Sequence, residues 1–234
     1  MPKRWLTRCT TIGLASLSLG ASTIVTGQAT TDVDLTLVLA VDCSYSVDDG
    51  EFALQMQGLA RAFVSHEVAA AIESGPRGRI AVALVEWAGV GEQRVVVPWT
   101  LVANDGSAEK FALLLSTTPR VVGPGSTSIS SAIDLSVQAT LAAPYHGERA
   151  VIDVSSDGTN NNGGPVEPAR DRAVLAGITV NGLVIMSEVF YLDLYFKNRV
   201  AGGPDHFVEK ADTYADYGKA ILRKLIKEIS RPSA

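Results

Sequence analysis

The chain has 234 residues, of which 47% are hydrophobic and 19% are charged, and its formal net charge is −5. This composition is typical of a globular protein and too apolar for a disordered one, and the length suits one domain. The sequence has no long run of Lys and Arg, so it does not favour a nucleic-acid-binding function.

The first 29 residues have the order of features found in a secretory signal peptide. A basic start precedes an apolar stretch of small residues from about Thr11 to Val25, and Gly27-Gln28-Ala29 is a suitable cleavage site. An uncleaved membrane anchor is disfavoured because the stretch is short and rich in Ser, Thr and Gly. We therefore expect a signal peptide at 1–29 and one metal-binding domain at 30–234, located in the periplasm or outside the cell.

Removal of this segment would change the charge and the cysteine content of the protein. Residues 1–29 carry three basic residues and no acid, so the net charge would become −8 instead of −5. Of the two cysteines only Cys43 would remain, which excludes an internal disulfide, and we interpret it as a small buried side chain. The remaining sequence has no candidate membrane span, so no stable membrane insertion is expected after cleavage.

The first elements predicted after the signal segment are a buried strand and a long helix. The run from Val33 to Val41 is almost continuously apolar, which is typical of a strand buried on both faces of a parallel sheet. A single helix is expected from about Asp48 to Ile72, where Asp48 and Glu51 resemble a capping box. One face of this helix carries apolar side chains that we expect in the core: Phe52, Met56, Leu59 and Phe63.

Strands and helices alternate along the rest of the chain. Further strands are expected at Arg79–Trp87, Arg94–Trp99, Ala150–Ser156 and Ile178–Ile185, and helices at Ala108–Ser116, Ser128–Ala142, Glu167–Ala176 and Asp212–Ile229. Pro98 places the second of these strands at a sheet edge, because proline cannot donate a ladder hydrogen bond. The alternation predicts one α/β domain with helices on both faces of a mostly parallel sheet.

Hard oxygen donors directly follow the first strand. Side chains alternate sides in an extended segment, so Asp42, Ser44 and Ser46 would converge, while Cys43 and Tyr45 would point away. One carboxylate and two hydroxyls suit Mg²⁺, Mn²⁺ or Ca²⁺ and not Zn²⁺. The string alone is equally compatible with serines that cap a helix or form turns.

Two later segments favour the metal interpretation. Gly125-Ser126-Thr127 lies in a glycine-rich loop before a helix, and Ser156-Asp157-Gly158 lies at the end of a buried strand. Asp42 and Asp157 both follow buried strands, so both belong at the carboxyl edge of the sheet, where open α/β sheets form their sites. Asn160 to Asn162, in the polar loop that runs to Pro165, are expected at the surface beside them, with contact to a ligand as the alternative.

These three strings occur in the order found in von Willebrand factor type A domains, which the chain resembles from about Val33 to Ile229. Other strings, such as RIAVALVEWAG and VIDVSSDGTNNNGG, resemble a subgroup of bacterial exported proteins whose domain has no known function. The resemblance implies a three-layer, Rossmann-like domain with a mostly parallel central sheet and one antiparallel edge strand. It also implies a metal-ion-dependent adhesion site for Mg²⁺, with Mn²⁺ or Ca²⁺ as alternatives. The ligands that it implies are Asp42, Ser44 and Ser46 from one loop, Thr127 from a second and Asp157 from a third.

We therefore expect a binding module rather than an enzyme, with a protein partner that offers Asp or Glu to the ion. A metal-dependent hydrolase is the first alternative, but it would need a nucleophile or general base beside the ion. A structural module with a stabilising metal is the second. Asp153 and Glu86 lie inside apolar strands, and we interpret them as paired or hydrogen-bonded structural charges rather than catalytic carboxylates.

Overall fold

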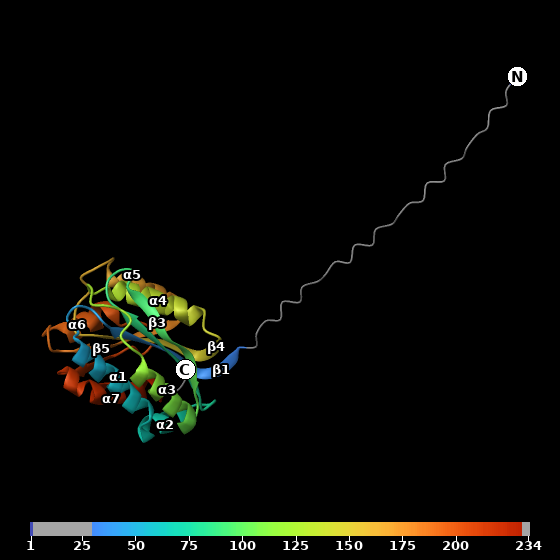
Figure 1. Cartoon of the computed structure of the whole chain (residues 1–234), viewed down its shortest axis with the longest axis horizontal. Coiled ribbons are helices and arrows are strands. Elements are labelled where there is room, and N and C mark those ends of the chain that lie inside the picture. Colours follow the sequence, from blue (N-terminus) through green and yellow to red (C-terminus); the bar gives the residue numbers. More distant parts are fainter. Residues whose placement is uncertain (2–29, 231–234) are drawn as a thin grey trace.

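The computed structural model describes residue 1 and residues 30–230, so the expected signal peptide lies outside the described residues. The described chain forms a six-stranded sheet with the order β3-β2-β1-β4-β5-β6 (Figure 1). The strands are β1 (Thr31–Asp42), β2 (Ile80–Trp87), β3 (Gln93–Val102), β4 (Tyr145–Ser156), β5 (Ile178–Ile185) and β6 (Val208–Ala211). All neighbouring pairs are parallel except β2 and β3, so β3 is the predicted antiparallel edge strand.

Helices cover both faces of the sheet (Figure 1). The helices on one face are α1 (Asp49–Phe63), α2 (His66–Glu73), α3 (Asp105–Thr117) and α7 (Tyr217–Ile229). Those on the other face are α4 (Ile129–Leu141), α5 (Val166–Leu175) and the short α6 (Leu192–Tyr195), which continues into a π-helical turn at Phe196–Val200. The predicted three-layer α/β fold is confirmed.

The residues of β1 show why this strand lies in the middle of the sheet. From Val33 onward every residue is buried, and alternate side chains enter the two hydrophobic clusters. Leu35, Leu37 and Leu39 pack on the side of α1 and α7, whereas Val38 and Ala40 pack on the side of α4 and α5. A strand with apolar side chains on both faces is stable only where helices exclude water from both.

Two predictions about the elements were wrong. The expected helix from Asp48 to Ile72 is two helices, because the Ser65 side chain accepts a hydrogen bond from Val68 N–H and begins α2 as a new helix. The last helix begins at Tyr217 rather than Asp212, and a 3₁₀ turn at Tyr214–Asp216 precedes it. The sequence analysis also missed β6 and α6, which are each only four residues long.

The topology gives the sheet a carboxyl edge, where the parallel strands end, and an opposite edge, where they begin. β1, β4 and β5 are parallel, so their carboxyl ends and the loops that follow them lie at one edge. β1 begins at the opposite edge, and α7 ends there. The Arg149 guanidinium holds the end of α7 by donating hydrogen bonds of 2.8 and 3.1 Å to the carbonyls of Glu228 and Ile229. No helix of the described residues is long and apolar enough to cross a membrane.

The two acids inside strands have structural partners, as predicted. Asp153 of β4 forms an ion pair of 2.7 Å with the fully buried Lys224 of α7, which also pairs with Glu228. Asn181 of β5 donates a hydrogen bond of 2.9 Å to the same glutamate. Glu86 of β2 accepts two backbone hydrogen bonds from the loop that follows α3. Asp153 therefore ties β4 to α7, and Glu86 holds a loop near the carboxyl edge.

Candidate metal centre

Asp42 ends β1 and is fully buried at the carboxyl edge of the sheet. Its Oδ1 accepts a hydrogen bond of 2.7 Å from Ser44 N–H, and its Oδ2 accepts one from the Ser156 hydroxyl at the end of β4. The first of these bonds turns the backbone out of the strand within two residues, as aspartate side chains commonly do. Cys43 packs into the hydrophobic core, as predicted, and Tyr45 is exposed.

Ser46 connects this first loop to Asp157. The Ser46 hydroxyl donates a hydrogen bond of 2.7 Å to Asp157 Oδ1 and lies 3.4 Å from the Ser44 hydroxyl. Ser44 and Asp157 are buried, whereas Ser46 reaches the surface. Four of the five predicted ligands, Asp42, Ser44, Ser46 and Asp157, therefore form one connected cluster.

Thr127, the fifth predicted ligand, lies beside this cluster. Its N–H donates a hydrogen bond of 2.8 Å to Asn161 Oδ1, and its carbonyl accepts from the N–H groups of Asn161 and Asn162. Tyr45 N–H donates to the Gly125 carbonyl at 2.8 Å, which holds the Thr127 loop against the first loop. Within the described chain Thr127 is thus positioned by Asn161 and by backbone contacts, not by a bond to either acid.

Burial makes the charged forms of Asp42 and Asp157 unfavourable. Burial, with a further contribution from the charge of Asp157, raises the pKa of Asp42 to about 7. Burial also raises the pKa of Asp157. Among the described residues, the buried Asp157 Oδ2 has no hydrogen bond of good geometry, although the Tyr214 hydroxyl lies close enough to lower the pKa of this carboxyl. Two carboxylates buried together are costly without a compensating cation.

This donor set fits a hard divalent ion. It offers two carboxylates and three hydroxyls, and among the described residues the buried Asp157 Oδ2 has no hydrogen bond of good geometry. No group of three or more His, Cys, Asp or Glu residues is placed to hold a metal within residues 30–230, so the fit depends on hydroxyl ligands. A concave surface adjoins the cluster and encloses a volume of about 500 Å³. It is lined by Tyr45, Ser46, Gly125, Ser126, Thr127 and Asn161.

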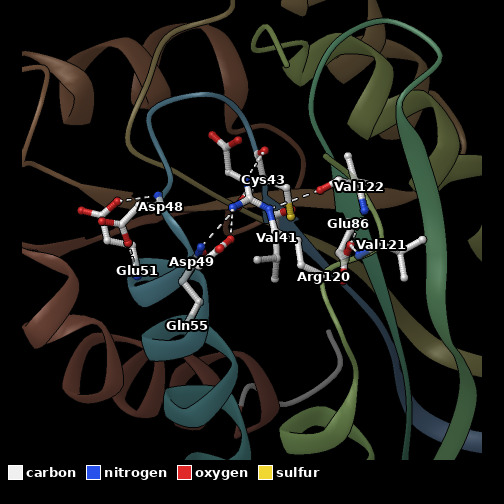
Figure 2. A network of polar contacts seen from close by, with 11 residues as sticks. Val41, Cys43, Asp48, Asp49, Glu51, Gln55, Glu86, Arg120, Val121 and Val122 are labelled. Atoms are coloured by element: carbon white, nitrogen blue, oxygen red, sulfur yellow. Dashed lines mark hydrogen bonds and ion pairs between the residues drawn. The ribbon is translucent and has the colours of Figure 1, made fainter. Parts of the chain in front are cut away.

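Polar contacts hold the backbone of the first loop, residues 42–46, at the carbonyls of Asp42 and Cys43 (Figure 2). The Arg120 guanidinium donates a hydrogen bond of 2.8 Å to the Cys43 carbonyl and one of 3.1 Å to Asp49 at the start of α1. Gln55 of α1 donates to the Asp42 carbonyl at 3.2 Å. On the other side of Arg120, Glu86 Oε2 accepts from Val121 and Val122 N–H. The loop is therefore fixed by helix α1 and by the segment that follows α3.

Sequence reasoning missed several residues around the centre. Ser156 belongs to the Ser-Asp-Gly string but was assigned no role, although its hydroxyl binds Asp42. Asn161 was expected in a surface loop beside the site, but its hydrogen bond to Thr127 N–H was not predicted. Tyr214 and Arg120 carried no signal, because only the tertiary fold brings their segments to this edge.

Comparison with known families decides where the chain belongs. A family model described as "Protein of unknown function (DUF1194)" matches residues 32–233. The chain belongs to this family. A comparison with curated protein sequences gave no match.

Solved structures show that the DUF1194 chain has the von Willebrand factor type A fold. It is similar to proximal thread matrix protein 1 from the mussel byssus, with a TM-score of 0.65 and 14% identity over 86% of this chain and 49% of that one. That structure has a zinc-occupied metal-ion-dependent adhesion site. The von Willebrand factor type A protein from Catenulispora acidiphila has a TM-score of 0.59 and 16% identity, over 84% of this chain and 43% of that one. The pilus adhesin SpaC from Lactobacillus rhamnosus GG has a TM-score of 0.61 and 15% identity, over 85% and 31%. The chain thus spans about half of the mussel protein's length, and these likenesses show the fold alone.

Proposed function

We propose that this protein is an exported binding module that engages a protein partner through a divalent metal ion at the carboxyl edge of its sheet. Asp42, Ser44, Ser46, Thr127 and Asp157 would hold the ion, with Mg²⁺ as the expected metal and Mn²⁺ or Ca²⁺ as alternatives. Residues 1–29 would direct export and be removed, which places the module in the periplasm or outside the cell.

The observation that carries this proposal is the buried pair of acids. Asp42 and Asp157 share one edge and are linked through Ser44 and Ser46, and Asp157 Oδ2 has no hydrogen bond of good geometry among the described residues. A cation would neutralise both carboxylates, and the three hydroxyls would supply further hard oxygens. The mussel protein, which has the same fold, has a zinc-occupied metal-ion-dependent adhesion site, and this supports a divalent metal site here without indicating which metal.

The partner is proposed to offer a carboxylate. Two acids balance the charge of a divalent ion without making the site strongly anionic, and hydroxyl ligands donate little electron density. A bound ion would therefore supply positive charge beside the concave surface lined by Tyr45, Ser46 and Thr127. An Asp or Glu side chain is the protein group that such a charge favours most, whereas Lys and Arg are repelled.

Binding is proposed rather than catalysis because the hydroxyl–carboxylate pairs at this site use the proposed metal ligands Asp42 and Asp157 as acceptors. The buried Cys43 lies in the hydrophobic core, and burial raises the pKa of its thiol, so it stays protonated at neutral pH. The Ser46 hydroxyl, the exposed hydroxyl of the cluster, donates to a carboxylate that is itself a proposed ligand. Metal-dependent turnover of a phosphoester, peptide or glycoside that is lost in Asp42→Ala would contradict this proposal.

A capture experiment tests the proposed function. The purified protein is immobilised and exposed to envelope extract with Mg²⁺, with EDTA, and with EDTA followed by excess Mg²⁺. We expect a specific protein that binds with Mg²⁺, is released by EDTA and binds again when Mg²⁺ returns. Amidation of one acidic residue of that protein, by Asp→Asn or Glu→Gln substitution, should abolish binding. A complex that forms equally well in EDTA would refute the proposal.

A further inference from the structure

The segment that follows β5 exposes large apolar side chains at the same edge as the candidate metal centre. Phe190 is 87% exposed, and the adjoining Tyr191 and Leu194 are also exposed. The rings of Phe190 and Tyr191 are in edge-to-face contact, with centroids 5.1 Å apart. We call Phe190, Tyr191 and Leu194 the aromatic surface. Contiguous exposed aromatic side chains are uncommon on monomeric proteins and typical of binding surfaces.

One hydrogen bond and the sheet topology connect this segment to the metal centre. Asn160 N–H, three residues after Asp157, donates a hydrogen bond of 3.3 Å to the Tyr195 hydroxyl at the end of α6. β5 pairs in parallel with β4, so the segment that follows β5 leaves the sheet next to Asp157, which follows β4. A ligand held at the metal centre would therefore lie close to the aromatic surface.

The charges on this segment limit what can bind there. Lys197 and Lys210 both pair with Asp193, at 3.4 and 3.7 Å. Glu188 is exposed and forms no ion pair with the described residues. Glu188 would repel a polyanion or a run of acids more strongly than a single acid with apolar neighbours, because a single acid meets this repulsion only once and is attracted by the ion.

We propose that the aromatic surface binds an apolar or aromatic side chain of the partner, placed a few residues from the acid that reaches the metal. This inference rests on the proposed function and adds the class of ligand: a protein segment with one acidic residue and an apolar neighbour. The metal supplies attraction for any carboxylate, and the aromatic surface selects among the segments that carry one.

A displayed peptide library tests this inference. Each peptide carries one fixed aspartate between randomised flanks, and selection on the purified protein is run with Mg²⁺ and with EDTA. We expect Mg²⁺-dependent enrichment of peptides with Phe, Leu, Ile, Trp or Tyr at a constant spacing from the aspartate. A synthetic peptide with that residue should bind at least about tenfold more tightly than the same peptide with glycine there.

Variants then assign the preference to the aromatic surface. The double variant Phe190→Ser, Tyr191→Ser should bind both synthetic peptides equally and keep its Mg²⁺-dependent rise in melting temperature. Leu175→Ser is the matched control, because Leu175 is equally exposed at 87% but ends α5, which leads to the start of β5 at the opposite edge. It should keep the tenfold preference.

Each other outcome contradicts the inference. Mg²⁺-dependent enrichment with random flanks, or with a flank preference that survives the double variant, would overturn it and leave the proposed function intact. Absence of Mg²⁺-dependent enrichment would overturn both the inference and the proposed partner carboxylate. A dimer of the free protein that dissociates in the double variant would show that a second copy covers this surface, and would also overturn the inference.

Discussion

Arg120 donates a hydrogen bond of 2.8 Å to the carbonyl of Cys43, the residue between the proposed ligands Asp42 and Ser44. The arginine follows α3 and reaches across to the first loop, so it ties two segments of the candidate metal centre together (Figure 2). In the described structure Arg120 forms no hydrogen bond or ion pair with the side chains of Asp42 and Asp157. Its role is to hold the backbone of the first loop in the conformation that brings the ligands together.

Arg120→Gln should weaken metal binding without removing a ligand. The loss of the charged donor leaves the Cys43 carbonyl poorly satisfied, and one hydrogen bond from a charged group contributes about 1.5–3 kcal/mol. Its bond to the exposed Asp49 should matter little. Calorimetric titration with Mg²⁺ should show an affinity at least about tenfold lower, since each 1.4 kcal/mol is a factor of ten. Arg94→Gln, in the β2–β3 hairpin, is the control and should bind Mg²⁺ as the wild type does. Equal affinities for the two variants would contradict the positioning role.

Lys224→Met should destabilise the fold strongly. The ammonium group is fully buried between Asp153 and Glu228, and its removal leaves two buried carboxylates without a cation. Loss of one partner of a buried ion pair costs roughly 3–5 kcal/mol, which urea unfolding would detect. Lys219→Met, an exposed position on the same helix, should stay within about 0.5 kcal/mol of wild type. A small effect of Lys224→Met would mean that the triad does not hold α7 on the sheet.

The same triad predicts a pH dependence of stability. Burial raises the pKa of Asp153 from 3.8 to about 7 and the charge of Glu228 adds to this, although Lys224 opposes it. Between those values the folded protein keeps a proton that the unfolded chain has released. The resulting stability is therefore fully present below pH 3.8 and is lost as the pH rises through about 7.

Asp153→Asn isolates this contribution. Melting temperatures in EDTA should fall between pH 5 and pH 8 more steeply for the wild type than for the variant. Because Asp42 also has a pKa of about 7, the informative quantity is the difference between the two proteins. Glu109→Gln, an exposed change on α3, should follow the wild type. Parallel curves for wild type and Asp153→Asn would show that the triad holds no extra proton.

The export proposal predicts a defined mature protein. The chain is expressed in a bacterium with two membranes, and the periplasmic and secreted fractions are analysed by intact mass. We expect a species that begins near Thr30 and lacks a disulfide, because only Cys43 would remain. A full-length species that stays in the membrane fraction would contradict the export proposal while leaving the metal proposal untouched.

The fold could be predicted largely from the sequence because its strands are strongly patterned. The apolar runs that form β1 and β4 stop at polar residues, and in a parallel sheet such stops must share an edge. Asp42 and Asp157 could therefore be placed at the same edge of the sheet from the sequence alone. The capping box at Asp48 and Glu51 was predicted and is confirmed.

What could not be predicted depends on tertiary contacts or on very short elements. The break at Ser65 depends on one side-chain cap inside a continuous helical pattern. β6 pairs with only four residues of β5 and has no apolar run of its own. The partner of Asp153 could not be named, because Lys224 looks like an ordinary surface residue until α7 is packed on the sheet. The aromatic surface was missed because an exposed and a buried aromatic residue look alike in a sequence.

The most direct test of the central claim is thermal unfolding of wild type and Asp42→Asn in Mg²⁺ and in EDTA. Asparagine keeps the shape of Asp42 and can still accept from Ser44 N–H and bond to Ser156, so the fold should survive. Mg²⁺ at about 100 times its dissociation constant should stabilise the wild type by roughly 2.7 kcal/mol, or roughly 5–10 °C. Asp42→Asn should show no such rise, and in EDTA it should be at least as stable as the wild type, because one of two buried charges is gone. A wild type that ignores Mg²⁺, or a variant that responds to Mg²⁺ fully, would contradict the claim that these acids hold a metal ion.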